Sequence, residues 1–335
     1  MLRFLLRLIL LVLVLGVAGA VAAGWAWQRY TGPGPLTEGR TVVIERGAGV
    51  NTIAQQLTEE GVLPDPWTLR VGVRLFGEGR SLKAGEYQFP AHVSPQAVLE
   101  KLASGEVVQR QVTIPEGLTS AQVVELLAAA DGLAGEVAAV PPEGSLLPET
   151  YSFTLGDSRE ALIQRMRTGM EAALAELWAK RAPELPLKSA EEAVTLASIV
   201  EKETGVAAER PRVAAVFVNR LKRGMPLQSD PTVIYALTGG KAASLANGEG
   251  ILGRRLTRAD LDADHPYNTY RIPGLPPGPI ANPGRASIAA VLNPPSTNDL
   301  YFVADGTGGH AFAATLDEHN RNVAKWRKLQ NGSAN

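Results

Sequence analysis

The longest apolar run of the sequence lies at its N-terminus. Residues 8–27 carry no charge over twenty positions and consist of aliphatic, glycine and aromatic residues. At a rise of about 1.5 Å per residue, a helix of this length spans the roughly 30 Å hydrocarbon core of a membrane. Trp25 and Trp27 stand at its far end, where aromatic residues are typical of a membrane interface. Arg3 and Arg7 precede the run, which favours a single-pass anchor with a cytoplasmic N-terminus.

The same run also has features of a cleaved signal peptide. Ala18-Gly-Ala20 and Ala20-Val-Ala22 both offer the small residues of a signal-peptidase site. The apolar stretch is long for a signal sequence, so an uncleaved helix in the cell (inner) membrane is favoured. Both interpretations place residues 31–335 on the periplasmic or extracytoplasmic side.

Two later segments share one order of patterns. VVIERGAGVNTIAQQLTEEGVL and VTIPEGLTSAQVVELLAAADGL each run from a short β-branched stretch through a turn into apolar residues at helical spacing. Each segment therefore predicts a strand, a turn and a helix, with Asn51 and Ser120 as the expected helix caps. A strand at 82–89 and a further helix are predicted between them. After a Gly- and Pro-rich linker at 31–40, residues 41–140 are expected to form a small α+β region.

From residue 144 onward the pattern becomes mainly helical. A Gly- and Pro-rich passage at 239–284 contains aromatic residues and is expected to be an ordered loop that contributes to a site. Two short strands joined by a Gly-rich turn, 300–303 and 310–312, predict a hairpin. The fold class is therefore α+β, with a mainly helical domain at 141–330 that has long loops and a β-hairpin. Its predicted helices cover 159–182, 190–204, 210–223, 231–237 and a short C-terminal segment through Trp326.

Composition narrows the possible functions. The chain has 335 residues, of which 45% are hydrophobic, enough for two domains with sizeable cores. The net charge of −1 gives no basic excess, which argues against nucleic acid as the main partner. The absence of cysteine excludes disulfides and thiolate metal sites. The four histidines have no metal-binding spacing such as HExxH, so neither a metal nor a cofactor is expected.

The stretch LASIVEKETG raises the main chemical question, because an uncharged run ends in Glu201, Lys202 and Glu203. Such acids are either solvated at a helix end or held in a dry pocket, where burial raises the pKa of a carboxyl and suits it to proton transfer. On a helical wheel, Glu201 shares a face with small and mostly apolar residues, whereas Glu203 lies near Glu192. Glu201 is therefore the better candidate for a general acid, with a solvated helix end as the alternative.

Two polar stretches further along the chain offer groups that bind sugars. Gln228, Ser229 and Asp230 supply an amide, a hydroxyl and a carboxylate before a predicted helix, although Asp230 is equally well explained as a helix cap. Tyr267 and Asn268 combine an aromatic face with an amide in the long loop. Sugars bind through this combination, but loop tyrosines also commonly serve in packing.

The end of the long loop, LPPGPIANPG, is made rigid by its prolines. It is first of all a structural turn, in which Asn282 could present its amide to a ligand. His310 follows Gly308 and Gly309, a position more typical of a structural histidine. Neither residue identifies a function by itself.

These segments occur in the order typical of one family. LASIVEKETG, VFVNRL, MPLQSDPTVIYAL, YNTYRIPGLPPGPIANPG and YFVADGTGGHAF with HNRNV resemble the MltG (YceG-like) endolytic murein transglycosylases. The resemblance runs from about Thr41 to the end of the chain and includes the anchor, and the small α+β region resembles the LysM-like part of that family. Departures are small: Ser229 stands where threonine is common, and residues 241–253 form a variable loop.

The resemblance implies an activity and a set of site residues. The family cleaves the β-1,4 bond between N-acetylmuramic acid and N-acetylglucosamine in peptidoglycan without water, leaving a 1,6-anhydromuramic end. One glutamate acts as acid and base where an ordinary glycosidase needs two carboxyls, and it aligns with Glu201. The resemblance also implies a limit on nascent strand length and association with peptidoglycan synthases. The residues expected to line the glycan groove are Gln228, Ser229, Asp230, Tyr267, Asn268 and Asn282, with Glu203 beside them.

Two other functions are compatible with the same residues. A non-catalytic glycan-binding module could use the polar loops and the LysM-like region without any acid. A hydrolase would need a second carboxyl to activate water, for which Glu203 or Asp230 would be available. The chemical form of the new glycan end, anhydro or free, separates the lytic enzyme from the hydrolase.

Overall fold

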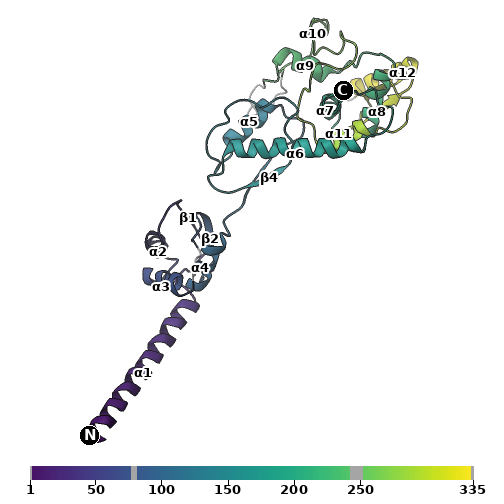
Figure 1. The fold of residues 1–335 in the computed structure, drawn as a ribbon. Coiled ribbons are helices and arrows are strands. Elements are labelled where there is room, and N and C mark those ends of the chain that lie inside the picture. Colours follow the sequence, from purple (N-terminus) through teal and green to yellow (C-terminus); the bar gives the residue numbers. More distant parts are fainter. Residues whose placement is uncertain (1, 77–80, 242–251, 333–335) are drawn as a thin grey trace. The chain divides into compact units, whose positions relative to one another are not determined.

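The chain folds into two compact units. Contacts between residues separate them at residues 1–110 and 111–335 (Figure 1). The variable loop predicted at 241–253 lies mostly outside the described residues, and the functional division between 41–140 and 141–330 stays a prediction. The residues that this computed structural model describes are 2–76, 81–241 and 252–332.

The N-terminal unit begins with helix α1 (Leu2–Thr31), which is long and apolar enough to cross a membrane. The two strands that follow pair antiparallel, with Arg40 opposite Phe89 and Ile44 opposite Gly85. Three helices cover this small sheet, and the large side chains Tyr87 and Phe89 are fully buried between them. The elements after α1 are β1 (Arg40–Ile44), α2 (Val50–Glu59), α3 (Pro66–Phe76), β2 (Gly85–Phe89) and α4 (Pro95–Ser104).

Two features of this unit differ from the sequence prediction. Gly49, not Asn51, is the N-cap of α2, and no side chain caps that helix, because the helix begins one residue before Asn51. Helix α3 is not predicted at all. Its apolar residues lie on two faces, with Leu69 buried and Leu75 exposed, so no single amphipathic stripe marks it.

The second unit contains the repeat of the strand-turn-helix pattern and a helical core. Strand β3 pairs with β4, a strand that the sequence analysis does not predict. Thr119, not Ser120, caps α5, through a reciprocal pair of hydrogen bonds with Gln122. The elements are β3 (Arg110–Thr113), α5 (Ser120–Ala129), β4 (Thr150–Phe153), α6 (Arg159–Ala179), α7 (Ala190–Glu203), α8 (Arg210–Lys222), α9 (Asp230–Thr238), α10 (Arg258–Leu261), α11 (Arg285–Leu292), β5 (Tyr301–Ala304), β6 (His310–Ala313) and α12 (Leu316–Gly332).

Helix α7 is the centre of the second unit. It packs against α8 and α11, and its residues from Ala193 to Val200 are all buried. Small side chains such as Ala197 and Ser198 allow this close packing, and Ser198 Oγ accepts a hydrogen bond from the Ile280 backbone N–H at 3.0 Å. Helix α11 is not predicted from the sequence, because it is short and begins directly after the Pro-rich loop.

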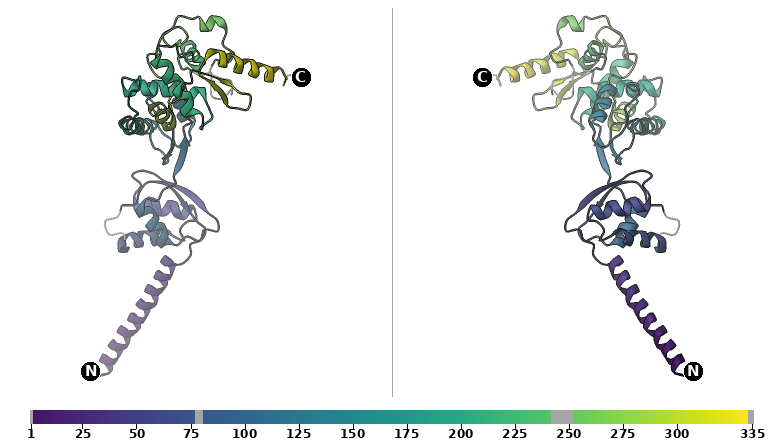
Figure 2. Two further views of the ribbon diagram at one scale, coloured as in Figure 1. Left: turned by 90° about the vertical axis from the view of Figure 1, so that its right-hand side faces the viewer. Right: turned by 90° about the vertical axis from the view of Figure 1, so that its left-hand side faces the viewer.

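The C-terminal elements form the predicted hairpin and a helix beside it. Strands β5 and β6 pair antiparallel, with Tyr301 opposite Ala313 and Ala304 opposite His310. Helix α12 lies along this hairpin, as the views in Figure 2 show. The α+β class, the apolar N-terminal helix and the hairpin are thus confirmed.

Candidate active site

Helix α7 carries the two acids that the sequence singles out, at its C-terminal end. Successive helical residues are rotated by about 100°, so Glu201 and Glu203 project about 200° apart around the axis. They therefore meet different partners and form two clusters. The Glu201 cluster consists of Glu201, Glu116, Lys202 and Arg210 with the backbone of Gly117 and Gly284, and the Glu203 cluster consists of Glu203, Ser229, Asp230 and Tyr270.

The Glu201 carboxylate is almost closed off from solvent, since its side chain is only 5% exposed. Arg210 Nη2 donates a hydrogen bond to Glu201 Oε1 at 3.3 Å, and the backbone N–H of Gly284 donates to Oε2 at 2.9 Å. Arg210 is the first residue of α8, and Gly284 is the N-cap of α11. A cation and the N-terminus of a helix both stabilise negative charge, so this carboxylate has two partners suited to it.

A second acid shares the same arginine. Glu116 lies in the turn between β3 and α5, and its Oε2 is 3.5 Å from Arg210 Nη2. Burial raises the pKa of Glu116 above its ordinary value and the charge of Glu201 raises it further, whereas Arg210 lowers it. One cation therefore stands between two acids, so that protonation of either acid affects the other.

Two glycines allow the backbone to approach these acids. Gly117 has a φ of +79°, in the left-handed region that favours glycine; a Cβ there would make only ordinary contact with the Glu201 side chain, at 3.5 Å, so the backbone conformation and not the space requires glycine. A Cβ on Gly284 would overlap the carboxylate of Glu116. Lys202 Nζ donates to the carbonyl of Gly117 at 3.2 Å, and burial lowers the pKa of this lysine. The turn that carries Glu116 is thereby fixed against the end of α7.

Glu203 faces the turn before α9. Ser229 Oγ donates a hydrogen bond to Glu203 Oε1 at 2.5 Å, and Ser229 is itself buried. Burial raises the pKa of Glu203 to about 7; the bond from Ser229 opposes this shift, and the negative charge of Asp230 adds to it. The sequence argument expects a desolvated acid at Glu201, and the Glu201 side chain is indeed buried; Glu203 is a second buried acid, which the sequence argument placed beside Glu192. The acid whose pKa burial raises into the neutral range is Glu203.

Three consecutive predicted residues, Gln228, Ser229 and Asp230, form the turn that leads into α9. Gln228 has a φ of 52°, a strained conformation for a residue other than glycine, and its side chain is exposed. The backbone N–H groups of Gln228 and Ser229 donate to the carbonyl and hydroxyl of Thr269 at 3.1 and 3.0 Å. Asp230, the first residue of α9 rather than its N-cap, accepts a hydrogen bond from the Tyr270 hydroxyl at 2.7 Å. Burial raises the pKa of Tyr270, so this donor keeps its proton.

The two predicted asparagines are buried and bonded inside the fold. Asn268 Nδ2 donates to two backbone carbonyls, at 2.9 and 2.7 Å. Asn282 Nδ2 donates to Leu118 O at 3.0 Å, and its Oδ1 accepts from Leu146 N at 3.0 Å. Both side chains are 0% exposed, so neither amide faces a groove as the sequence argument expects. The amides hold the loops around the site, because buried backbone groups need partners.

Tyr267 and His310 take the structural roles that the sequence analysis left open for them. The ring of Tyr267 packs on Tyr235 with centroids 4.9 Å apart, against the core of the second unit. His310 is held by Glu209, which accepts from the histidine backbone N–H at 2.9 Å and lies 2.7 Å from its Nδ1. Both side chains are only partly exposed.

Sequence reasoning missed three charged residues at or near the site: two belong to the Glu201 cluster, and one holds His310. Glu116, Glu209 and Arg210 lie in turns or at a helix start, where charged residues are common and have no periodic pattern. The only signal for Arg210 and Glu209 is their position shortly after LASIVEKETG, where a following helix packs back on α7. Among the described residues, no group of three or more His, Cys, Asp or Glu side chains is placed to hold a metal ion.

These features define a carboxylate-centred site, built by turns and helix ends around one central helix. Comparison with known proteins then places the chain: it matches the YceG-like family over residues 42–325 and belongs to that family.

Two named relatives and one solved structure are similar to the chain. The chain is 32% identical to the endolytic murein transglycosylase of Bacillus subtilis, over 86% of this chain and 85% of that protein. It is 30% identical to the endolytic murein transglycosylase of Streptococcus pneumoniae, covering 85% of this chain but only 58% of that longer protein. The crystal structure of a YceG-like protein from Listeria monocytogenes superimposes with a TM-score of 0.50 at 30% identity, over 85% of this chain and 99% of that one.

Proposed function

We propose that this protein is a membrane-anchored endolytic lytic transglycosylase of peptidoglycan. It cleaves the β-1,4 bond between N-acetylmuramic acid and N-acetylglucosamine inside nascent glycan strands and leaves 1,6-anhydromuramic ends. The observation that carries the proposal is the Glu201 carboxyl, 5% exposed at the end of a buried helix and held between Arg210 and the Gly284 backbone N–H. The names of the relatives support the same substrate.

Glu201 performs both proton transfers in this mechanism. Protonated Glu201 donates to the glycosidic oxygen as the bond from the muramic C1 to that oxygen breaks. The resulting carboxylate then takes the proton of the muramic 6-hydroxyl, whose oxygen forms the new bond to C1. The proton lost in the first step is regained in the second, so the enzyme is restored and no water is consumed.

Arg210 contacts two acids, and this allows Glu201 to become protonated when substrate binds without leaving the arginine unpaired. Glycan in the site would exclude water, which disfavours the charged form of a carboxyl. Arg210 already contacts Glu116 as well, so it can remain paired with Glu116 when Glu201 takes up a proton. Arg210 Nε is buried and, among the described residues, has no hydrogen-bond partner. A buried donor without a partner is costly, and its bonding would be completed by a bound ligand.

The Glu203 cluster is proposed to bind the glycan beside the bond that is cut. Gln228 and Asp230 are exposed and carry an amide and a carboxylate that suit sugar hydroxyls. Ser229 and Glu203 support this turn from beneath through their hydrogen bond. Tyr267, Asn268 and Asn282 are assigned a positioning role, because their contacts lie within the loops that form the site.

The N-terminal unit is proposed to place the enzyme at the membrane where strands are made. Helix α1 would span the membrane with Arg3 and Arg7 in the cytoplasm, so the second unit acts outside the cell membrane. The strands and helices after α1 would serve as a LysM-like glycan-binding part. Anchored cutting of nascent strands would limit their length, in association with peptidoglycan synthases.

Mass spectrometry of glycan fragments tests this proposal. The full chain in detergent is incubated with uncross-linked nascent glycan, beside Glu201→Gln. Internal fragments with anhydro ends, lost in the variant, are the expected result. Fragments with free reducing ends would identify a hydrolase, and an intact, well-folded protein that cuts nothing would be a binding module.

One observation favours the hydrolase as the second candidate. Because burial raises its pKa to about 7, Glu203 is poised near neutrality, as a general acid or base should be. In that case Glu203 would activate a water molecule and the new ends would be free. This alternative would be favoured if the parent protein produced free reducing ends and the Glu203→Gln variant no longer cleaved glycan.

A further inference from the structure

Helix α3 of the N-terminal unit exposes a continuous row of large apolar side chains. Trp67, Val71 and Leu75 are spaced by one helical turn and are 39%, 42% and 62% exposed, and Phe76 beside them is 48% exposed. The opposite face of α3 is buried through Leu69 in the core of the unit. A soluble domain rarely leaves such a row uncovered, so the exposed face indicates an apolar partner.

The row is continuous with the aromatic end of α1. Trp67 stacks on Trp25 with ring centroids 6.4 Å apart, and Phe76 stacks on Tyr30 at 5.3 Å. Trp27 meets the edge of Phe76 at 6.0 Å. These α1 residues lie at the end of the apolar run, where a spanning helix leaves the hydrocarbon core. With α1 spanning the membrane as proposed, the apolar face of α3 would lie at the depth of the headgroups of the outer leaflet.

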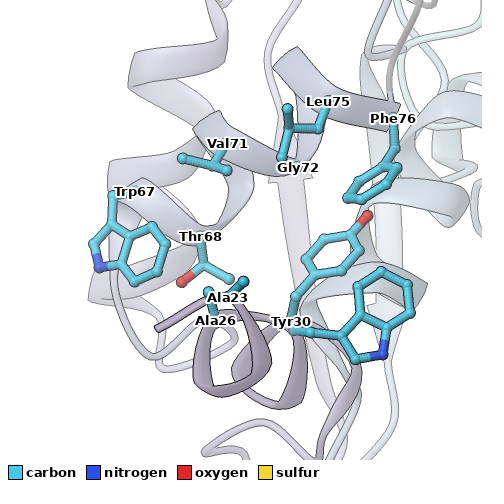
Figure 3. Close-up of a pocket in the computed structure, with 10 residues that line it drawn as sticks. Ala23, Ala26, Tyr30, Trp67, Thr68, Val71, Gly72, Leu75 and Phe76 are labelled. Atoms are coloured by element: carbon cyan, nitrogen blue, oxygen red, sulfur yellow. The ribbon is translucent and has the colours of Figure 1, made fainter. Parts of the chain in front are cut away.

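Helices α1 and α3 also enclose an apolar groove of about 190 Å³. Figure 3 shows Ala23 and Ala26 of α1 on one side and Val71 and Gly72 of α3 on the other. Gly72 is needed for this contact, because a Cβ there would lie 2.7 Å from the Tyr30 ring. The groove leaves room beside the anchor for hydrocarbon.

Basic residues flank the apolar row. Arg70 and Arg74 are exposed and lie one turn apart on α3. At about 100° per residue they fall on one side of the row formed by Trp67, Val71 and Leu75. An apolar stripe bordered by arginines is the pattern of a helix that lies in a membrane interface and contacts anionic headgroups.

We propose that α3 is an interfacial membrane helix, with its apolar row in the acyl–headgroup boundary of the outer leaflet and its arginines at lipid phosphates. The proposal rests on α1 spanning the membrane, as the proposed function has it. The occupant of the exposed face is lipid rather than protein, because the face continues the membrane-facing surface of α1. Such a helix would hold the small sheet of the N-terminal unit against the bilayer surface.

Site-directed spin labelling tests this directly, because the chain has no native cysteine. Single variants Leu75→Cys and Val71→Cys of the full chain carry a nitroxide in bilayers of phosphatidylethanolamine and phosphatidylglycerol. Collision rates with apolar oxygen and with a water-soluble nickel chelate are measured. Val43→Cys is the matched control, since Val43 lies on β1 of the same unit and is 41% exposed. Val14→Cys in α1 reports whether the anchor is in the membrane.

At residues 71 and 75 the ratio of oxygen to nickel collisions should exceed the ratio at residue 43 several-fold and approach that at residue 14. Nickel accessibility at residues 71 and 75 equal to that at 43 would overturn the proposal, as the helix would then face water. Protection from both reagents would also overturn it, because a second copy or another protein would cover the face. A water-accessible residue 14 would instead show that the anchor proposal itself fails.

Discussion

Glu201 and Glu203 are two residues apart on α7, yet the Glu201 cluster and the Glu203 cluster give their carboxyls different surroundings. Glu201 has a cation and a backbone N–H as partners, from Arg210 and Gly284. Glu203 has a neutral hydroxyl, Ser229, and the negative charge of Asp230 nearby. The first environment offers the carboxyl a positive charge and a backbone donor, whereas in the second environment burial raises the pKa of Glu203 to about 7.

In the proposed mechanism, the acid with the raised pKa is not the acid that transfers protons. Burial raises the pKa of Glu203 to about 7, and Ser229 Oγ donates a hydrogen bond to its carboxyl at 2.5 Å. The carboxyl of Glu201 is held by Arg210 and by the backbone N–H of Gly284, and in the proposed mechanism bound glycan rearranges these partners. In the proposed mechanism, Glu201 moves protons and Glu203 sets the shape of the turn that binds glycan.

The largest expected effect is that of Glu201→Gln. An amide cannot donate and regain the proton, so the rate of anhydro-end formation should fall by about 10²–10⁴-fold, the usual contribution of a general acid–base. The matched control is Glu203→Gln, which should stay within about tenfold of the parent because it leaves the proton-transfer group in place. Initial rates from chromatography of the fragments give the comparison. Equal losses in both variants would remove the distinction between the two clusters.

Arg210→Gln should have the next largest effect. Removing one partner of a buried ion pair leaves uncompensated charge, with a cost of about 3–5 kcal/mol in unfolding free energy. The Glu201 and Arg210 side chains are 5% and 12% exposed, so this pair is shielded from solvent. Denaturant unfolding and fragment release measure stability and activity.

The same helix provides the control for this variant. Arg212 pairs with Asp299 at 2.6 Å but is 50% exposed. Because Asp299 is only 10% exposed and would lose this partner, Arg212→Gln should also reduce stability, but it should leave cleavage intact. If Arg210→Gln and Arg212→Gln destabilise the protein equally and neither reduces cleavage, Arg210 has no specific role in the activity of the Glu201 cluster.

Glu203→Gln should change the pH dependence of stability. The folded-state pKa of about 7 lies above the ordinary value of 4.5, so between these values the folded protein binds more protons than the unfolded chain. Unfolding free energy of the parent should therefore fall as pH rises through this window, by at most roughly 3 kcal/mol from this residue. The variant lacks this contribution and should be the more stable protein at pH 8. Parallel stability curves for parent and variant from pH 4.5 to 8 would contradict the raised pKa.

Tyr270→Phe should have the smallest effect. It removes the hydroxyl that donates to Asp230 at 2.7 Å, and a hydrogen bond of this kind contributes about 1 kcal/mol. With Asp230 less firmly oriented, KM for glycan should rise a few-fold while kcat stays close to that of the parent. Steady-state kinetics on soluble glycan fragments provide the check. A fall in kcat with no change in KM would move Tyr270 from glycan binding to the chemical step.

The two strand-turn-helix segments show how much of the fold the sequence carries. Both are predicted from β-branched stretches, turns and helical spacing, and both form, as β1–α2 and β3–α5. The local pattern does not indicate that the two segments lie in different units. It also does not indicate that only the second segment supplies an acid, Glu116, to the Glu201 cluster. That role depends on contacts between Glu116 and residues far along the chain, such as Arg210.

Site residues that stand in a distinctive local pattern could be predicted from the sequence. Site residues that depend on contacts between distant segments could not. Glu201 stands out because it follows a long buried run on α7. The burial of Asn268 and Asn282 could not be read from their loops, because an amide among prolines and glycines satisfies either a ligand or the backbone. Arg210 was missed because its two partners, Glu116 and Glu201, come from two separate segments, and no spacing in the sequence links them.

The central claim is that Glu201 serves as the only acid and base and that water takes no part. Cleavage of nascent glycan by the full chain in water enriched in heavy oxygen tests it most directly. The proposed mechanism predicts anhydro-ended fragments that carry none of the label, because the new bond to C1 uses the substrate's own 6-hydroxyl. Heavy oxygen at newly formed reducing ends, retained in Glu201→Gln, would contradict it.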